Sequence, residues 1–239
     1  MAAKISRRSL LFLSGLGLRC GGARQALRPV ESAVDHLLLG VADLDRGIDW
    51  VEEKTGVRAV IGGSHPGVGT RNALISLGGR RYLEIIAPDP EQDEYRSHID
   101  VRSFTEPRIV TWAASATDIE AVAARARETR HRFQGPSDGS RARPDGKLLR
   151  WRTLDVVAEL DRQGIDPVPF FIEWAADSIH PAEDSPKGCE LLSIEIEHPE
   201  SAAVAELLEG LGVEAAVEQG PDTRIIATLR TLKGEVRLS

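Results

Sequence analysis

The alternation of apolar and polar residues after residue 33 predicts a strand, a helix and three more strands in succession. The apolar run Val34–Gly40 is typical of a buried strand that ends at a glycine. Residues 44–54 carry apolar side chains at helical spacing, with Asp43 before them as an N-cap and Gly56 after them as a stop. The remaining strands are expected at residues 57–61, 72–77 and 81–87, with a glycine pair in the last hairpin turn.

The same order of elements begins again near residue 109. A helix is expected from Asp118 to about residue 130, and a loop rich in Gly, Pro and Ser is expected at residues 135–146. The strands of this second copy are expected at residues 109–114, 147–154 and 168–174.

A third copy is partial. It has a strand at residues 191–197, an amphipathic helix at 200–211 and two strands within 224–238. Repetition on this scale is evidence about architecture. We therefore predict an α+β fold of repeated βαβββ units at residues 33–90 and 108–181, with a partial unit at 190–239 packing on them.

Charge is distributed unevenly along the 239 residues. The first 30 residues hold six basic side chains and no acidic one, which leaves 24 basic and 37 acidic residues, a formal charge of −13, in the remainder. Because an acidic body repels phosphate backbones, we expect no nucleic-acid partner. The content of 41% hydrophobic and 28% charged residues is ordinary for a globular protein.

Residues 1–30 form a basic leader. Ser-Arg-Arg at positions 6–8, followed by an apolar run at 10–18, resembles a twin-arginine export signal to the periplasm. Arg19 directly after the run and the lack of an Ala-x-Ala site before Pro29 count against it, and organelle import or an uncleaved tail are the alternatives. The run has nine residues, well short of the roughly 20 that span a bilayer, so we expect no membrane span.

Two strands carry an aromatic residue two positions before a glutamate. These pairs are Tyr82 with Glu84 and Phe171 with Glu173, and they stand at matching points of the first two copies. Side chains two apart share one face of a strand. A carboxylate in an apolar strand is costly without a partner, so we expect both glutamates to face a cavity. A solvent-exposed face or a salt bridge is the alternative for the glutamates, and core packing for the rings.

His36 lies inside the first apolar strand. Its neighbour Asp35 is expected to point to the opposite face and not to contact it. His36 is therefore interpreted either as a metal ligand or as a half-buried histidine bonded to another neighbour.

These residues together resemble a known superfamily. Asp35-His36-Leu-Leu-Leu-Gly-Val and Tyr82-Leu-Glu84-Ile-Ile-Ala-Pro are similar to the first unit of vicinal oxygen chelate proteins, which include glyoxalases, bleomycin resistance proteins and extradiol dioxygenases. Phe170-Phe171-Ile-Glu173-Trp174 is similar to the glyoxalase-like subgroup. The resemblance implies mixed sheets that curl into a cup between paired units.

It also implies a site in that cup. A divalent metal ion of unknown identity would be held by His36, Glu84 and Glu173, leaving positions for the adjacent oxygens of a small substrate. The two glutamates would be catalytic, and Tyr82, Phe171 and Trp112 would contact the substrate.

The second unit departs from the superfamily pattern. Trp112 stands where a second His or Gln is expected, and an indole has no lone pair for a metal. A cup without a metal therefore stays open, and His65 and His180 are the other imidazoles that could complete a site.

Two function hypotheses follow, together with an interface role. The first is a metal-assisted enzyme of the lyase, isomerase or dioxygenase type that acts on a small oxygenated substrate. The second is a metal-free protein that binds or sequesters a small molecule in the same cup. In the third, the partial third unit forms an interface, as in a homodimer, and the protein is mainly a structural subunit. The fold hosts several chemistries and does not choose between them.

Overall fold

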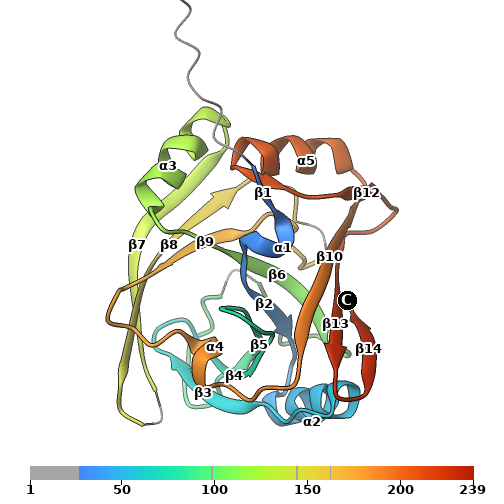
Figure 1. The fold of residues 1–239 in the computed structure, drawn as a ribbon. Coiled ribbons are helices and arrows are strands. Elements are labelled where there is room, and N and C mark those ends of the chain that lie inside the picture. Colours follow the sequence, from blue (N-terminus) through green and yellow to red (C-terminus); the bar gives the residue numbers. More distant parts are fainter. Residues whose placement is uncertain (1–26, 98, 144, 162) are drawn as a thin grey trace, which may run out of the picture.

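The computed structural model describes residues 27–239 with the exception of residues 98, 144 and 162 (Figure 1). The leader motif predicted in residues 1–26 lies outside the described residues. No helix in the described part of the chain combines the length and the apolar character needed to cross a membrane.

The first unit runs from residue 34 to residue 88. Its helix begins where the sequence predicts, because the Asp43 side chain accepts a hydrogen bond from the backbone N–H of Arg46. The helix ends at Gly56, whose φ of 77° is the left-handed conformation that glycine adopts without cost. Its elements are β2 (Val34–Gly40), α2 (Leu44–Thr55), β3 (Val60–His65), β4 (Thr70–Ser76) and β5 (Tyr82–Pro88).

The second unit repeats this order with one departure from the prediction. The sequence predicts a loop at residues 135–146, but most of them belong to β7, the edge strand that pairs antiparallel with β8. The pairing register shifts between Gln134 and Ser137, so a bulge accommodates the Gly-Pro sequence there. The elements are β6 (Arg108–Ser115), α3 (Ile119–Glu128), β7 (Arg132–Ala142), β8 (Leu148–Val157) and β9 (Phe170–Trp174).

The two units share one eight-stranded sheet of order β3-β4-β5-β2-β6-β9-β8-β7. In each unit the first strand lies parallel to the last, β2 beside β5 and β6 beside β9, and β2 pairs antiparallel with β6 at the centre. The sheet curls until its edge strands β3 and β7 come into contact. At this seam Arg141 on β7 donates a hydrogen bond to the carbonyl oxygen of Gly62 on β3. The predicted α+β class and the curled sheet are thus confirmed.

The last strands of the chain build a second layer beside this sheet (Figure 1). Their four-stranded sheet has the order β12-β10-β13-β14, and β10 pairs antiparallel with β13, so its strand order differs from that of the first two units. A short parallel pair joins β1 to β11. The elements are β1 (Arg28–Pro29), α1 (Val30–Ala33), α4 (Pro181–Asp184), β10 (Glu190–His198), α5 (Ser201–Gly210), β11 (Val213–Glu214), β12 (Val217–Gln219), β13 (Arg224–Thr231) and β14 (Gly234–Leu238).

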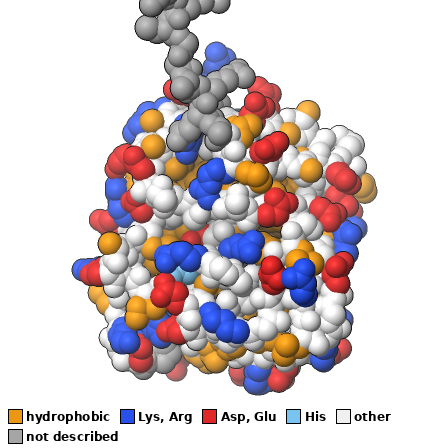
Figure 2. Space-filling model, in the orientation of Figure 1, with side chains coloured by type: hydrophobic (Ala, Val, Ile, Leu, Met, Phe, Trp, Pro, Cys, Tyr) orange, Lys and Arg blue, Asp and Glu red, His pale blue; other side chains and the backbone are white. Residues whose placement is uncertain are grey.

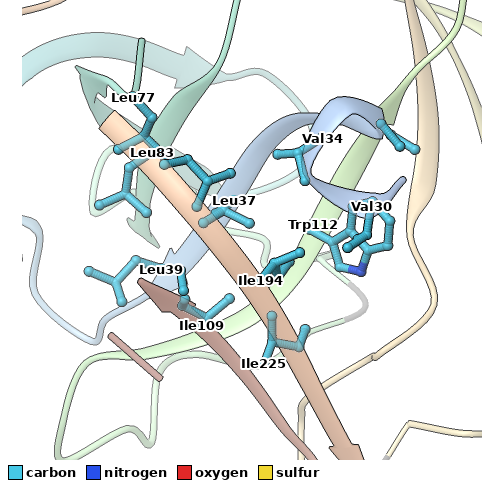
Figure 3. Close-up of a cluster of buried hydrophobic side chains, with 14 of the residues drawn as sticks. Val30, Val34, Leu37, Leu39, Leu77, Leu83, Ile109, Trp112, Ile194 and Ile225 are labelled. Atoms are coloured by element: carbon cyan, nitrogen blue, oxygen red, sulfur yellow. The ribbon is translucent and has the colours of Figure 1, made fainter. Parts of the chain in front are cut away.

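The main hydrophobic core lies between the two sheets (Figure 3). Leu37 and Leu39 of β2 pack there with Ile194 of β10 and Ile225 of β13. Because side chains alternate along a strand, His36 and Leu38 point to the opposite, inner face of the eight-stranded sheet. On the outer surface seen in Figure 2, basic and acidic side chains are interspersed.

Candidate functional site

The inner face of the eight-stranded sheet encloses a cavity of about 720 Å³, which we call the cup. This volume is within the range of small-molecule sites. Apolar side chains form much of its lining, among them Leu38, Ile86, Val110, Phe170 and Ile172. A smaller group of polar side chains converges at one end: His36, His65, Asn72, Glu84 and Arg141.

Three of the predicted site residues meet in the cup. The Nε2 atom of His36 on β2 lies 3.4 Å from Oε2 of Glu84 on the neighbouring strand β5, and both side chains are buried. The ring of Tyr82 stacks on His36, with 4.4 Å between ring centroids. These contacts follow from the parallel pairing of β2 with β5, in which His36 lies beside Tyr82.

Asp35 does not point away from His36, contrary to the expectation from strand alternation. The carboxylate Oδ1 lies 2.8 Å from Nδ1 of His36. The cause is a β-bulge: the pairing of β2 with β6 shifts register between Val34 and His36, which leaves Asp35 as the extra residue. Bulges commonly re-aim side chains beside functional sites.

The Asp35 carboxylate is a buried acceptor for three donors. Besides His36, it contacts Nε2 of His180 at 3.1 Å and Nε1 of Trp174 at 3.1 Å. His180 accepts a hydrogen bond at Nδ1 from the backbone N–H of Ala182, so its proton is on Nε2. Burial alone would raise the pKa of Asp35, but the hydrogen bonds from His180 and His36 outweigh it and lower the pKa to about 2.

These contacts place one proton of His36. An ionised carboxylate can only accept, so Nδ1 of His36 carries the proton that it donates to Asp35. The other ring nitrogen, Nε2, faces Oε2 of Glu84 at the same end of the cup. Asp35 is therefore a positioning residue for His36.

Glu84 is held at the same end of the cup by Asn72. The Nδ2 atom of Asn72 donates to Oε1 of Glu84 at 2.7 Å. Burial would raise the pKa of Glu84, but the neighbouring imidazoles of His65 and His36, with the Asn72 hydrogen bond, lower it overall. Glu84 is therefore an ionised carboxylate at neutral pH.

His65 supplies a second imidazole to this end. Its Nε2 lies 3.6 Å from Oε1 of Glu84, and its Nδ1 contacts the Thr70 hydroxyl at 2.8 Å. Burial lowers the pKa of His65, and the neighbouring Glu84 carboxylate partly opposes this shift. Of the two imidazoles considered as additions to the site, His65 reaches the cup, whereas His180 is buried against Asp35.

Glu173 and Phe171 lie outside the cup. Glu173 accepts a hydrogen bond from the backbone N–H of Ile119 at the start of α3 and lies 3.8 Å from Arg152. Phe171 packs in the main core. The cup-facing residues of β9 are instead Phe170, Ile172 and Trp174.

Glu173 and Phe171 lie outside the cup because the strand register differs by one residue between the two units. His36 lies beside Tyr82 in the first unit, and Ala113 lies beside Phe170 in the second. Glu84 comes two residues after Tyr82, and Ile172 comes two residues after Phe170. Ile172 therefore occupies the position that corresponds to Glu84. The second unit therefore carries apolar residues where the first carries an imidazole and a carboxylate, and its aromatic-x-Glu motif faces the other way.

Trp112 also belongs to the core. Its side chain is fully buried with Leu37 and Leu39, and its indole N–H donates to the carbonyl oxygen of Pro167 (Figure 3). Thr111, the preceding residue, lines the cup instead. A substrate contact through Trp112 is therefore not part of the site.

The predicted three-ligand metal centre is not assembled, because Glu173 points away from His36 and Glu84. Throughout the described ranges, no group of three or more His, Cys, Asp or Glu side chains is arranged to hold a metal ion. His36 and Glu84 have donor atoms that suit a divalent ion, but they are two of the expected three. The ligand set implied by the resemblance therefore does not fit the residues that meet in the cup.

Among the residues that sequence reasoning missed are two polar ones that line the cup. Asn72 lies in a predicted strand and carries no motif, and Arg141 lies in the segment expected to be a loop. The alternation of β4 could have placed Asn72 on the cup face, two residues before Leu74, which faces Glu84 across the strand pair. Arg141 gave no such signal.

Two βαβββ units that join through their first strands around one cavity are the architecture of the vicinal oxygen chelate superfamily, and this chain is a member. Within that class, the chain belongs to the family of glyoxalase-like domains, whose family model matches residues 34–212. No curated protein matches the chain by sequence.

Solved structures are similar to the chain at low sequence identity. A hypothetical protein from Staphylococcus aureus is similar with a TM-score of 0.63 and 16% identity, over 86% of this chain and 98% of that one. For methylmalonyl-CoA epimerase from Mycobacterium tuberculosis the TM-score is 0.42 and the identity 21%, over 64% of this chain and 94% of that one. For a mutant of 4-hydroxymandelate synthase from Streptomyces coelicolor the TM-score is 0.47 and the identity 17%, over 87% of this chain and 62% of that one. At 16% identity, the likeness to the Staphylococcus aureus protein concerns the fold alone.

Proposed function

We propose that this protein is an enzyme of the isomerase or lyase type that moves a proton on a small oxygenated substrate in the cup. The observation that supports it is the alignment of Asp35, His36 and Glu84. Asp35 lies 2.8 Å from one ring nitrogen of His36, and Glu84 lies 3.4 Å from the other. An imidazole that one carboxylate orients and that faces a second carboxylate in the cup is an arrangement suited to general acid–base catalysis.

In the proposed step, Nε2 of His36 removes a proton from a carbon next to a substrate carbonyl. The C–H electron pair forms a new C–C double bond, and the carbonyl pair moves to the oxygen to give an enolate. Return of the proton to another face or atom gives an isomer, and loss of a leaving group gives a lyase product. The carboxylates of Asp35 and Glu84 stabilise the positive charge that His36 gains.

Exchange of hydrogen for deuterium tests this function directly. The full chain is incubated in D₂O with a panel of small aldehydes, ketones and 2-oxo acids, and loss of the C–H signal is followed by NMR. We expect enzyme-dependent exchange on at least one compound, and its rate should fall about a hundred-fold or more in His36→Gln and in Glu84→Gln. The matched control is Glu173→Gln, which changes a glutamate outside the cup and should exchange at the wild-type rate.

Chelator treatment separates this mechanism from the metal-assisted one. We expect exchange to survive dialysis against a chelator. Loss of exchange that one divalent ion restores would replace the side-chain mechanism with a metal-assisted reaction. Absence of exchange throughout the panel, or equal rates in wild type and His36→Gln, would refute the proposal.

A second candidate function is binding or sequestration of a small apolar molecule without turnover. It is favoured by the second unit, where Ala113 and Ile172 stand in place of the imidazole and carboxylate of the first unit. A ligand that binds in the cup, is released unchanged and binds equally well to His36→Gln would support this function over the enzyme.

A further inference from the structure

Arg141 is a buried cation that lines the cup. It is 5% exposed, and its guanidinium group has five N–H donors. Within the described residues it makes one hydrogen bond, to the carbonyl oxygen of Gly62. No carboxylate among those residues lies within the 4.0 Å of an ion pair with Arg141. A buried charge without a contacting opposite charge is costly, so an anionic partner would be strongly favoured here.

The backbone of β3 is shaped to receive this side chain. A Cβ atom on Gly63 would lie 2.9 Å from Nη1 of Arg141, and the φ of Gly63, +136°, is a conformation that side chains disfavour. A Cβ on Gly62 would collide with Oδ1 of Asn72. The glycine pair thus lets Arg141 and Asn72 approach β3 closely, and one edge of the guanidinium group is anchored there.

The charges around the cup single out Arg141. Its lining includes the acidic residues Glu84, Asp155, Glu159, Asp161 and Asp166 and the basic residues Arg96 and Arg141. Arg96 is exposed and paired with Glu94. A negatively charged ligand group would therefore be attracted to Arg141, the buried one of these two basic residues.

We propose that the ligand of the cup is a small carboxylic acid with an apolar body, and that Arg141 binds its carboxylate. A guanidinium group matches a planar carboxylate through two parallel N–H···O bonds. Leu38, Val110 and Phe170 would contact the apolar body. The identity of this ligand as a substrate rests on the proposed function, whereas its binding does not.

The test compares carboxylates with their neutral amides. Binding of phenylacetate, hexanoate and butyrate and of the three matching amides to the full chain is measured by calorimetry. We expect at least one carboxylate to bind about ten-fold or more tightly than its amide. In Arg141→Met, which keeps the apolar stem, this preference should vanish while amide binding is unchanged, and Arg141→Lys should keep part of it.

Several outcomes would overturn the inference. One is equal binding of every carboxylate and its amide to the wild type, a comparison that needs no variant to fold. Another is a folded Arg141→Met that retains the full preference. His36→Gln distinguishes this inference from the proposed function: it should lose proton exchange and still prefer the carboxylate.

Discussion

Replacement of the buried Asp35 by asparagine is expected to destabilise the protein by about 2–4 kcal/mol near pH 7. The pKa of Asp35 is about 2 against the ordinary 3.8, which corresponds to about 2 kcal/mol of stabilisation when the group is ionised. The amide introduced by Asp35→Asn would in addition turn an NH₂ group toward one of three donors and leave that donor without an acceptor. These donors are His36, His180 and Trp174.

The pH dependence has a definite sign. Because the pKa of Asp35 is lower in the folded than in the unfolded chain, its stabilisation is complete above about pH 5 and is lost as the pH falls toward about 2. The difference between wild type and Asp35→Asn should therefore shrink over that interval. Urea unfolding at a series of pH values measures it, with Asp43→Asn, an exposed helix cap, as the matched control that should change stability little.

Imidazole ¹⁵N chemical shifts provide a second readout for the same variant. In the wild type His36 should carry its proton on Nδ1, and in Asp35→Asn the two tautomers should mix, because the acceptor-only carboxylate is gone. An unchanged tautomer would count decisively against the positioning role of Asp35. A loss of stability below about 0.5 kcal/mol, the range of ordinary surface substitutions, would contradict the energetic argument.

Three further predictions concern Asp166 in the lining of the cup, Gly63 at the seam and Trp112 in the core. Burial raises the pKa of Asp166 to about 7, so between about pH 4 and 7 the folded chain keeps a proton that the unfolded chain has lost, and the free energy of unfolding falls over that interval. In urea unfolding, Asp166→Asn should therefore stabilise the protein by about 2–4 kcal/mol near pH 8 and little near pH 4. Gly63→Ala should lower the free energy of unfolding by about 1–3 kcal/mol. The loss should be larger than for Gly67→Ala, because Gly67 also has a positive φ but a Cβ added there would meet no atom within 4 Å. Equal shifts of the melting temperature in the two variants would contradict this. Trp112→Ala should cost about 3–5 kcal/mol in urea unfolding as a core truncation, yet leave carboxylate affinity in the cup unchanged, whereas Phe170→Ala should weaken it.

The parts of the fold that follow local rules could be predicted from the sequence. The run Val34–Gly40 is entirely buried, and α2 starts and stops at its predicted caps, since both features depend on residues adjacent in the chain. The strand β7 could not be predicted, because its glycines and proline ordinarily mark a loop. Its strand conformation depends on pairing with β8 and on a bulge, which the local sequence does not reveal.

In the candidate site, too, some residues could be placed from the sequence and others could not. His36 and Glu84 could be brought together from sequence, because the first and last strands of a unit lie side by side. Strand alternation predicts the wrong face for Asp35, because the alternation holds only where no bulge interrupts the strand. The likeness of Glu173 to Glu84 predicts the wrong face for Glu173, because a shift of one residue in register is enough to turn a side chain to the other face.

The two units therefore contribute different chemistry to one cavity. The first provides His36, His65 and Glu84, which meet at one end of the cup. The second provides apolar residues at the corresponding positions, and its one buried cation, among the described residues lining the cup, is Arg141 on the edge strand β7. A ligand that satisfies both must place a polar, reactive group at His36 and an anionic group at the seam. Because β3 and β7 meet only when the sheet is fully curled, the curl of the sheet itself brings the anion-binding residue to the same end of the cup as His36 and Glu84.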